Sequence, residues 1–451
     1  SLTVSGASTL ANTITTTGAQ TYNGAVTLGA DTTLTTSSNG SVVFSSTVNG
    51  TKNLTVSTNG TGDVTFGGAV GGSSGLTGLT ITTDVLSAGA LTLASNSGIS
   101  ITNGGASEIT GAITGTGVTL TKAGNGTLTL SGDNAYTGST TINAGTLKLG
   151  HVNGLGGTGS SATTTVGSGA TLDLNSLTVG ETVVVNGGRI LNGVLSGPIS
   201  LSADSSFEAG SGESVTMNGV ITGSYGITLS GGGTFTLGGN NTGYTGNTTV
   251  SSGTLRVTNN NALGSGVGTT TIGAGATLDL VGVNVAAGSL ALNGGTLKDA
   301  TSTWGGSVVL SGNTTFDVGA GDTLIVSGVI SGTGTLTKVG SGVLSLSRVN
   351  GYTGSTTISA GTLALTGSGS IADSAKLVAN STFDISGTTS GASVKSLDGS
   401  GFVVLGSKTL SVTAANDTFA GEISGTGGLT LTSGTLTLSG ANAYTGTTTI
   451  S

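Results

Sequence analysis

The side chains that most often carry enzyme chemistry are scarce in this sequence. His151 is the single histidine among 451 residues, and cysteine is absent, so few nucleophile–base pairs and no cysteine-based zinc site can form. The closest group of acidic residues is Asp204, Glu208 and Glu213. A polysaccharide-cleaving site would need several charges that converge from neighbouring segments, and no long insertion that could build such a cleft is present. The sequence therefore predicts a protein that is not an enzyme, with no catalytic, metal-ligating or cofactor-binding residue.

Five acidic residues, Glu208 among them, follow a leucine or an aromatic residue in alternating segments, which predicts that they point away from the core. Such carboxylates could bind a divalent cation. Isolated outward charges also keep a β-sheet soluble and discourage pairing at its edges, and we favour this second interpretation. The residues are Asp173, Glu208, Asp279, Asp317 and Asp384.

The charge distribution excludes two classes of partner. The net charge is −8 and the isoelectric point is about 4.4, with 11 lysines and arginines that are scattered one at a time. No basic stripe could neutralise a nucleic-acid backbone, and no polybasic segment could bind anionic lipid. No run of about 18 apolar residues is present either, so we expect no nucleic-acid partner and no membrane span in this segment.

One sequence motif, with the pattern Asn/Thr-x-Tyr-Thr-Gly-x-Thr-Thr-Ile/Val, recurs along the chain. Its tyrosines are Tyr136, Tyr244, Tyr352 and Tyr444, and they are separated by 108, 108 and 92 residues. A long and nearly fixed period is typical of a stack of equivalent units. Such a stack does not close around one central core.

The tyrosines of this motif allow two interpretations. An aromatic ladder could touch sugars or another surface, or each tyrosine could cap the core at a turn with its hydroxyl group at the edge. Because these tyrosines are several turns of the stack apart, we favour the structural role. Asn134, Asn350 and Asn442 precede three of them, and we expect them to serve the adjoining turn, where asparagine tolerates the left-handed conformation.

At short range the sequence alternates with a period of two, which is typical of β-strands. Thr127–Leu130, Thr146–Leu149, Thr171–Leu174 and Thr277–Leu280 place leucine on one face and Thr, Lys or Asp on the other. No segment shows helical spacing, and proline, which would remove a ladder donor, occurs only at Pro198. We therefore expect an all-β protein with almost no helix.

The distance between similar strands predicts the architecture. Similar Gly-Thr-Leu segments start at Gly126 and Gly145, 19 residues apart, and the related Gly-Ala-Thr-Leu segment starts at Gly169, 24 residues further on. This spacing is too long for a hairpin and too short for a βαβ unit, but it suits one turn of a right-handed parallel β-helix. Leu128, Leu147 and Leu172 would then stack in the interior, and the chain would make about 20 turns.

The repeated motif resembles the passenger-associated transport repeat of bacterial autotransporters. The resemblance is carried by Gly-x-Leu-Thr-Lys-x-Gly-x-Gly-x-Leu-x-Leu-Ser-x-x-Asn-x-Tyr-Thr-Gly, best preserved in Ile113–Leu147 and Ile330–Leu363. The copies that start at Ile221 and Ile423 lack the lysine, and Asn241 lies one position earlier than expected. We expect one continuous β-helix over residues 1–451, with looser turns in 1–112, long repeats in 113–220, 221–329 and 330–422, and a partial repeat in 423–451.

This resemblance implies an exported passenger that acts as an adhesin, stalk or fibre on the cell surface of a Gram-negative bacterium. Its partners would be glycans or proteins of a host or neighbouring cell. The chain itself is a further expected partner, because neither end carries a polar cap and either more turns follow or copies stack end to end. Two other classes stay open: a carbohydrate-active β-helix enzyme, and an ice-binding β-solenoid, which would need threonines in strict register. Thr15–Thr17, Thr163–Thr165, Thr269–Thr271 and Thr447–Thr449 do not predict that register at every turn.

Overall fold

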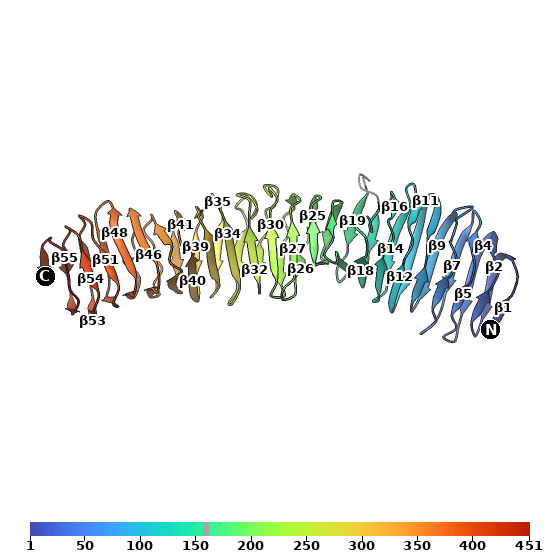
Figure 1. Cartoon of the computed structure of the whole chain (residues 1–451), viewed down its shortest axis with the longest axis horizontal. Helices are drawn as coiled ribbons and strands as arrows, with labels where there is room; N and C mark the ends of the chain where they lie inside the picture. The colour runs from blue at the N-terminus through green and yellow to red at the C-terminus, as the bar shows by residue number, and fades with distance from the viewer. Residues whose placement is uncertain (157–161) are drawn as a thin grey trace. The chain divides into compact units, whose positions relative to one another are not determined.

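A computed structural model describes residues 1–156 and 162–451, and it contains no helix in these residues. The chain divides into two compact units. Unit 1 is Ser1–Glu208 with Ser214–Ile221, and unit 2 is Ala209–Glu213 with Thr222–Ser451. Each unit is a parallel β-solenoid (Figure 1), and the described residues make about 22 turns. The predicted all-β parallel coil is confirmed, and its right-handed winding stays a prediction. Within the described ranges, no helix has the length and hydropathy needed to cross a membrane.

Unit 1 stacks equivalent strands in columns, and all of its assigned strand pairs are parallel. The first column is β1 (Leu2–Val4), β3 (Gln20–Tyr22), β5 (Val42–Phe44), β8 (Val64–Phe66), β10 (Leu86–Ala88), β12 (Ala106–Ile109), β15 (Thr127–Leu130), β18 (Thr146–Leu149), β20 (Thr171–Asp173), β23 (Arg189–Leu191) and β26 (Ser205–Glu208). The second column is β2 (Ser8–Thr16), β4 (Val26–Thr36), β7 (Asn53–Ser57), β9 (Leu76–Thr83), β11 (Leu91–Asn103), β14 (Thr119–Ala123), β17 (Thr140–Ile142), β19 (Thr163–Val166), β22 (Thr182–Asn186) and β25 (Ile199–Ala203). The remaining strands are β6 (Val48–Asn49), β13 (Ile113–Gly115), β16 (Ala135–Tyr136), β21 (Thr178–Val179), β24 (Gly193–Leu195) and β27 (Ser214–Met217), and β28 (Ile221–Thr222) lies at the boundary of the units.

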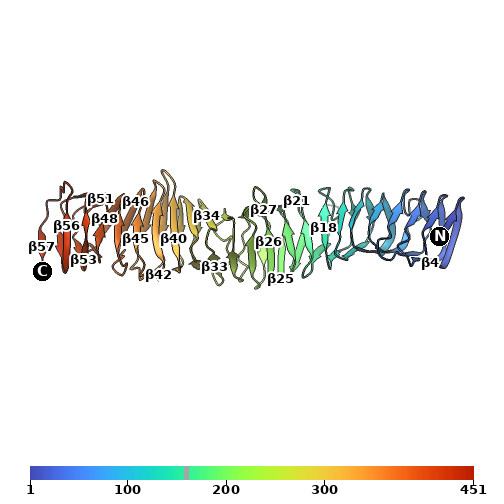
Figure 2. The ribbon, with the colours of Figure 1, turned by 90° about the horizontal axis from the view of Figure 1, so that it is seen from below.

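Unit 2 has the same architecture, with strands stacked one turn apart (Figure 2). One column is β29 (Ile227–Ser230), β31 (Thr248–Val250), β33 (Thr269–Ile272), β36 (Ser289–Leu292), β39 (Val308–Leu310) and β42 (Ile330–Gly332). A second is β30 (Thr234–Leu237), β32 (Thr254–Val257), β34 (Thr277–Val281), β37 (Thr296–Ala300), β40 (Asn313–Val318), β43 (Thr335–Val339), β45 (Thr356–Ile358), β47 (Leu377–Ala379) and β50 (Leu397–Asp398). A third is β35 (Asn284–Val285), β38 (Ser302–Trp304), β41 (Thr323–Val326), β44 (Val343–Leu346), β46 (Thr362–Gly367), β48 (Thr382–Thr388), β51 (Phe402–Val404) and β54 (Glu422–Ser424). Shorter sets are β49 (Ala392–Val394), β52 (Leu410–Val412), β55 (Leu429–Leu431) and β57 (Thr448–Ile450), and β53 (Ala415–Phe419) with β56 (Gly434–Leu438).

The interior of each unit is an aliphatic ladder that follows from the alternation of side chains. Leu128 pairs with Leu147, and Leu147 pairs with Leu172, as predicted. The same column continues to Ile190 and Phe207, and all five side chains are fully buried. Each turn therefore removes a few apolar side chains from water, at about 25 cal/mol per Å² of apolar surface.

Glycine is required where the chain turns closely over the turn below. Gly145, Gly253 and Gly361 each precede a Thr-Leu strand and have φ of +65°, +82° and +68°. A Cβ atom at Gly361 would lie 2.3 Å from the carbonyl oxygen of Gly342. A side chain at this position would thus meet both an unfavourable φ and a backbone atom that belongs to the ladder.

We expect Gly361→Ala to destabilise unit 2 more than Gly275→Ala does. Gly275 also has a positive φ, of +77°, but a Cβ there would meet nothing within 4 Å, so this control isolates backbone strain of about 1–3 kcal/mol. Thermal unfolding followed by circular dichroism measures both variants. An equal loss of stability would contradict the close approach at Gly361.

Candidate functional site

The repeat tyrosines are interior residues. The rings of Tyr136 and Tyr352 are fully buried, and their hydroxyl groups lie 2.6 Å from the hydroxyls of Thr140 and Thr356. Burial raises the pKa of both phenols far above the usual value, because the phenolate would be desolvated. These two rings offer no face to a ligand outside the solenoid.

The other two tyrosines keep part of this arrangement. Tyr244 is also buried, and its hydroxyl donates to the carbonyl oxygen of Asn247 at 2.6 Å. Tyr444 is half-buried, with its hydroxyl 2.6 Å from that of Thr448. The hydroxyl group of each repeat tyrosine is therefore bonded within its own turn.

The repeat asparagines connect successive turns. Asn134 accepts a hydrogen bond from the N–H of Ile113 at 2.8 Å, and its amide donates to the carbonyl of Gly154 at 2.7 Å. Asn350 likewise accepts from the N–H of Ile330 at 2.8 Å. Both side chains are buried, so each supplies main-chain partners where the strand ladder is interrupted.

The expected left-handed backbone conformation of these asparagines is wrong. Asn134, Asn350 and Asn442 are absent from the residues with positive φ, and Asn442 makes the same bond, to the N–H of Ile423 at 3.0 Å. Asparagine therefore serves at this position through the hydrogen bonds of its side-chain amide, and not through its tolerance of a positive φ. Asn241, which is one position displaced, is buried as well.

The repeat lysines form an interior feature that sequence analysis did not identify. Lys122 is fully buried, and its ammonium group donates to the carbonyl oxygens of Ala123, Gly124 and Ala144 at 2.8, 2.8 and 3.2 Å. A lysine at an inward position of an alternating strand was the available signal, since Leu120 and Lys122 share a face.

Lys338 repeats this cage in unit 2. Its ammonium donates to the carbonyls of Val339, Gly340 and Ala360 at 2.6, 2.7 and 3.3 Å. Burial lowers the pKa of Lys122 and of Lys338 to about 8. The ammonium thus closes a turn from inside and ties it to the next turn.

The acidic residues of the sequence analysis lie apart from one another. Asp173 faces Lys148 at 3.8 Å, and Glu208 pairs with Arg189 at 2.8 Å. Asp279 lies on the outer face of β34, because the inward positions of this strand are Leu278 and Leu280. It is nevertheless buried, because Arg256 covers it and forms an ion pair with it, with an oxygen–nitrogen distance of 2.9 Å. Asp317 and Asp384 are half-buried, and Asp317 lies in register with Lys298.

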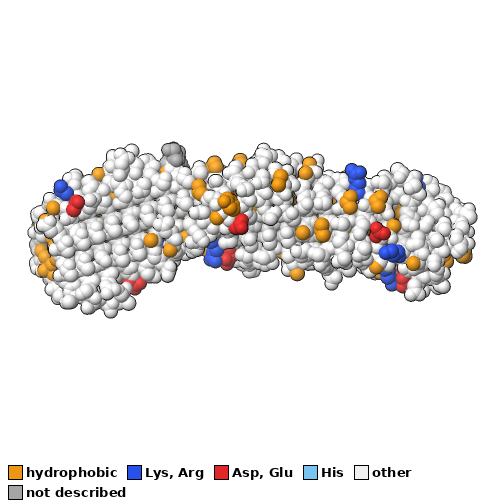
Figure 3. Space-filling model, turned by 180° about the vertical axis from the view of Figure 1, so that it is seen from behind, with side chains coloured by type: hydrophobic (Ala, Val, Ile, Leu, Met, Phe, Trp, Pro, Cys, Tyr) orange, Lys and Arg blue, Asp and Glu red, His pale blue; other side chains and the backbone are white. Residues whose placement is uncertain are grey.

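The remaining candidates for chemistry have local partners. Nδ1 of His151 accepts from the N–H of Asn153 at 3.2 Å, and a carboxylate oxygen of Glu213 accepts from the N–H of Gly210 at 2.9 Å. Asp204 is also bonded. Among the described residues, no group of three or more His, Cys, Asp or Glu could hold a metal ion. On the face shown in Figure 3, charged side chains are few and lie singly or in small groups.

Threonines of unit 1 are in closer register than the sequence analysis expected. Within the strand column that starts at β2, outward hydroxyl residues of β2, β4, β7, β9, β11, β14, β17 and β19 pair directly from turn to turn and form a column of side chains. A second column of hydroxyl side chains runs beside it over the early turns. The first column is Thr13, Thr33, Thr55, Thr80, Ser100, Thr121, Thr141 and Thr165, and the second is Thr15, Thr35, Ser57, Thr82 and Thr102. The register is not kept at every turn, as expected, because Thr165 pairs next with Val184 and Thr102 with Ala123. Over the turns in which it is kept, these residues form one surface, which we call the hydroxyl face.

We expect Lys338→Leu to remove a pH dependence of stability. The pKa of Lys338 is lower in the folded protein than in the unfolded chain, so between about pH 8 and pH 10.5 the unfolded chain binds more protons and the free energy of unfolding rises with pH, by up to about 3 kcal/mol. Leucine is the natural residue at the equivalent positions Leu229 and Leu431, so the variant should fold.

Chemical denaturation of wild type and Lys338→Leu between pH 7 and pH 10 measures this difference, and Lys148→Leu, at an outward lysine, is the control. The stability of the wild type relative to Lys338→Leu should increase with pH over this range. Parallel pH profiles would show that Lys338 keeps its usual pKa.

Comparison with known proteins identifies the repeats. The family model described as passenger-associated-transport-repeat matches residues 120–149, 227–257, 336–365 and 433–451. The adhesin BmaC autotransporter of Brucella suis biovar 1 (strain 1330) is 34% identical over 179 residues, which are 36% of this chain and 5% of the relative. No solved structure matches the chain. The predicted repeats are confirmed: the chain carries passenger-associated transport repeats and is similar, over part of its length, to an autotransporter adhesin.

Proposed function

We propose that this chain is an adhesive or stalk-forming extracellular segment of a bacterial surface protein. The observation that carries the proposal is the family match, which falls on each of the four tyrosine-containing repeats. The partial similarity to an autotransporter adhesin and the parallel solenoid of both units agree with it. A solenoid adds turns at nearly constant stability per turn, which suits a segment whose task is to present surface.

The proposed location is the cell surface of a Gram-negative bacterium. The proposed partners are glycans or proteins on a host or neighbouring cell, and further copies of this chain. A non-enzymatic role is part of the proposal, and its support is the printed name of the relative, an adhesin. The buried repeat tyrosines and lysines then serve the scaffold, and recognition falls to the outer faces.

Beads that carry the chain should attach to cells more strongly than beads coated with an inert protein of similar charge. Attachment to epithelial cells and to bacteria, counted by microscopy under flow, measures this, and clumping of the beads alone reports self-association. Beads that bind neither cells nor one another would contradict the proposal. New reducing ends from surface polysaccharides would instead favour a carbohydrate-active enzyme.

The hydroxyl face favours a second candidate function, the binding of ice. Its threonine and serine side chains recur once per turn, at the roughly 4.8 Å spacing of paired strands, and two columns run side by side in β4, β7, β9 and β11. A regular array of methyl and hydroxyl groups can order water into a repeating layer. Isolated threonines could not do so.

If this second function is present, the chain should show thermal hysteresis, measured by nanolitre osmometry. Thr55→Lys and Thr80→Lys should then abolish it, because a lysine disrupts the array. Thr65→Lys is the matched control, since Thr65, like Thr55, is a half-buried strand residue of unit 1 but belongs to β8 in the column of β1. Absence of hysteresis in the wild type, or equal hysteresis in all variants, would exclude ice binding.

A further inference from the structure

One column of unit 2 contains a break in its main-chain ladder. After β42, this column continues through a single parallel bridge between Val349 and Ser370. The N–H of Ser370 donates to the carbonyl of Arg348, and its own carbonyl accepts from the N–H of Asn350, both at 3.0 Å. Both main-chain groups of Ser370 are therefore used by the turn on the N-terminal side.

The column resumes at β49, which pairs only with β52 among the described strands. The N–H of Ala392 donates to the carbonyl of Thr409 at 3.0 Å, and the carbonyl of Val394 accepts from the N–H of Thr413 at 3.0 Å. Because alternate residues of a strand direct their N–H and C=O groups to opposite sides, Ser393 directs its groups away from β52.

Between these two segments lies one ladder step that is not made. A regular parallel ladder would join the N–H of Ser393 to the carbonyl of Gly369, and the N–H of Ile371 to the carbonyl of Ser393. Within the part of the chain that the structure describes, none of these four groups has a hydrogen bond. Elsewhere in the same column, the ladder groups are paired from turn to turn.

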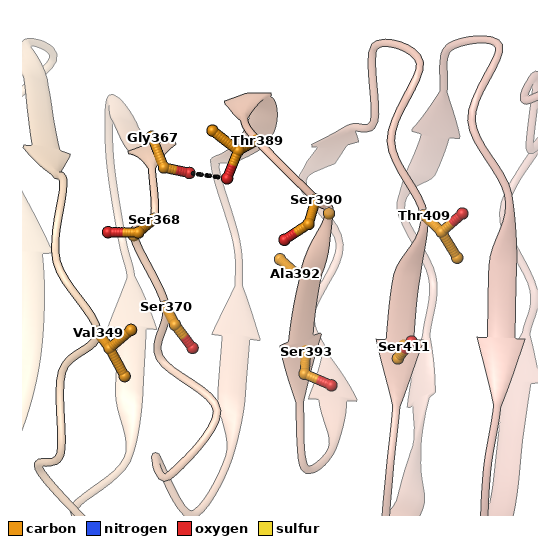
Figure 4. A pocket seen from close by; sticks show the side chains of 12 residues that line it. Val349, Gly367, Ser368, Ser370, Thr389, Ser390, Ala392, Ser393, Thr409 and Ser411 are labelled. Atoms are coloured by element: carbon orange, nitrogen blue, oxygen red, sulfur yellow. Dashed lines mark hydrogen bonds between the residues drawn. The ribbon is translucent and has the colours of Figure 1, made fainter.

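A groove of about 430 Å³ occupies the missing step. Figure 4 shows Ser368 and Ser370 on one side, with Ser390 and Ser393 on the other. Val349, which is 63% exposed, adds an apolar contact. No charged or aromatic side chain lines the groove.

Hydrogen bonds connect the residues of the corner beside the groove. The pairing of β46 with β48 shifts register between Ala364 and Thr366, immediately before Gly367, which lines the groove. Thr389 then donates to the carbonyl of Gly367 from both its N–H, at 2.8 Å, and its hydroxyl, at 3.1 Å, the latter drawn in Figure 4. The N–H of Gly391 donates to the hydroxyl of Thr388 at 3.1 Å, so the corner has its own hydrogen bonds while the strand edge beyond it is free.

We propose that this groove binds an extended polypeptide strand, which inserts between Ser370 and β49 and completes the ladder on both sides. Addition of a strand to a free sheet edge uses main-chain hydrogen bonds for affinity. The free C=O of Gly369, the free N–H of Ile371 and the free N–H and C=O of Ser393 have the spacing of donors and acceptors along a β-strand, so the backbone of an extended peptide can pair with them. A glycan would more often use aromatic or charged side chains, which this groove lacks. The proposal does not depend on the adhesive role of the chain.

The guest strand should be uncharged and carry small or aliphatic side chains, because serine, glycine and alanine line the groove. A suitable probe is the heptapeptide Gly-Ser-Val-Val-Leu-Ser-Gly, which reproduces residues 306–312 around β39. This segment already forms a strand in the same column, so its side chains fit the neighbouring turns.

Fluorescence polarisation of the labelled heptapeptide with the full chain should show saturable binding. Ser393→Pro should weaken binding at least about tenfold, because proline removes the N–H that faces the groove and obstructs the edge. This N–H makes no bond within the fold, so the variant should keep its thermal unfolding transition. The double variant Ser368→Ala/Ser390→Ala, which removes only hydroxyl groups, is the matched control and should bind normally.

A second arm keeps the test decisive if Ser393→Pro does not fold. The same heptapeptide with alternate N-methylated amides cannot complete the ladder, and it should fail to bind the wild-type chain. Equal binding of both peptides, or no binding of the unmodified peptide, would overturn the proposal. Saturable binding of maltoheptaose that is lost in Ser368→Ala/Ser390→Ala but kept in Ser393→Pro would replace it with a neutral glycan site.

Discussion

The parallel main-chain ladder between successive turns is the constraint on which both units depend. Each turn has too few apolar side chains to form a core alone, and its N–H and C=O groups would be unpaired without a neighbour. The ladder satisfies those groups and at the same time sets the register, so that Leu128, Leu147 and Leu172 are placed one above another. Once register is set, every inward position must suit a dry interior and every outward position faces water.

The polar residues of the repeat are explained by this division. Lys122 and Lys338 occupy inward positions, where a charge is unfavourable unless hydrogen bonds surround it. Three carbonyl oxygens per ammonium provide that surrounding. They belong to corners, where strands end and the ladder cannot supply a partner. Asn134 and Asn350 likewise provide side-chain partners for main-chain groups that the ladder leaves unpaired, the N–H groups of Ile113 and Ile330. The repeat motif is therefore a set of corner bonds, and leucine can stand at the lysine position, as Leu229 does.

The strand content, the parallel coil and its period could be predicted from the sequence, because alternation and spacing are local properties of the chain. Features that depend on the strand register across several turns could not be predicted in this way. Thr33, Thr55 and Thr80 of the hydroxyl column are 22 and 25 residues apart in the sequence. Because the turns differ in length, such a column has no fixed spacing that could be recognised in the sequence. The role of Asn134 was mistaken for a backbone preference, because the bond to Ile113 joins residues 21 positions apart. The lysine cage had a local signal, an inward lysine in an alternating strand, but the carbonyl of Ala144 that completes it lies 22 residues away.

Recognition in such a molecule has two physical routes. Where the ladder is complete, only outward side chains are available, and on the hydroxyl face of unit 1 these are hydroxyl groups in register. Where the ladder is broken, as between Ser370 and Ser393, the backbone itself becomes available. A free strand edge is normally avoided because it invites association. This edge is short and lies in a groove, which suits one extended chain better than the edge of a second sheet. The same interaction that builds the solenoid therefore also sets the chemistry of the partner it can accept.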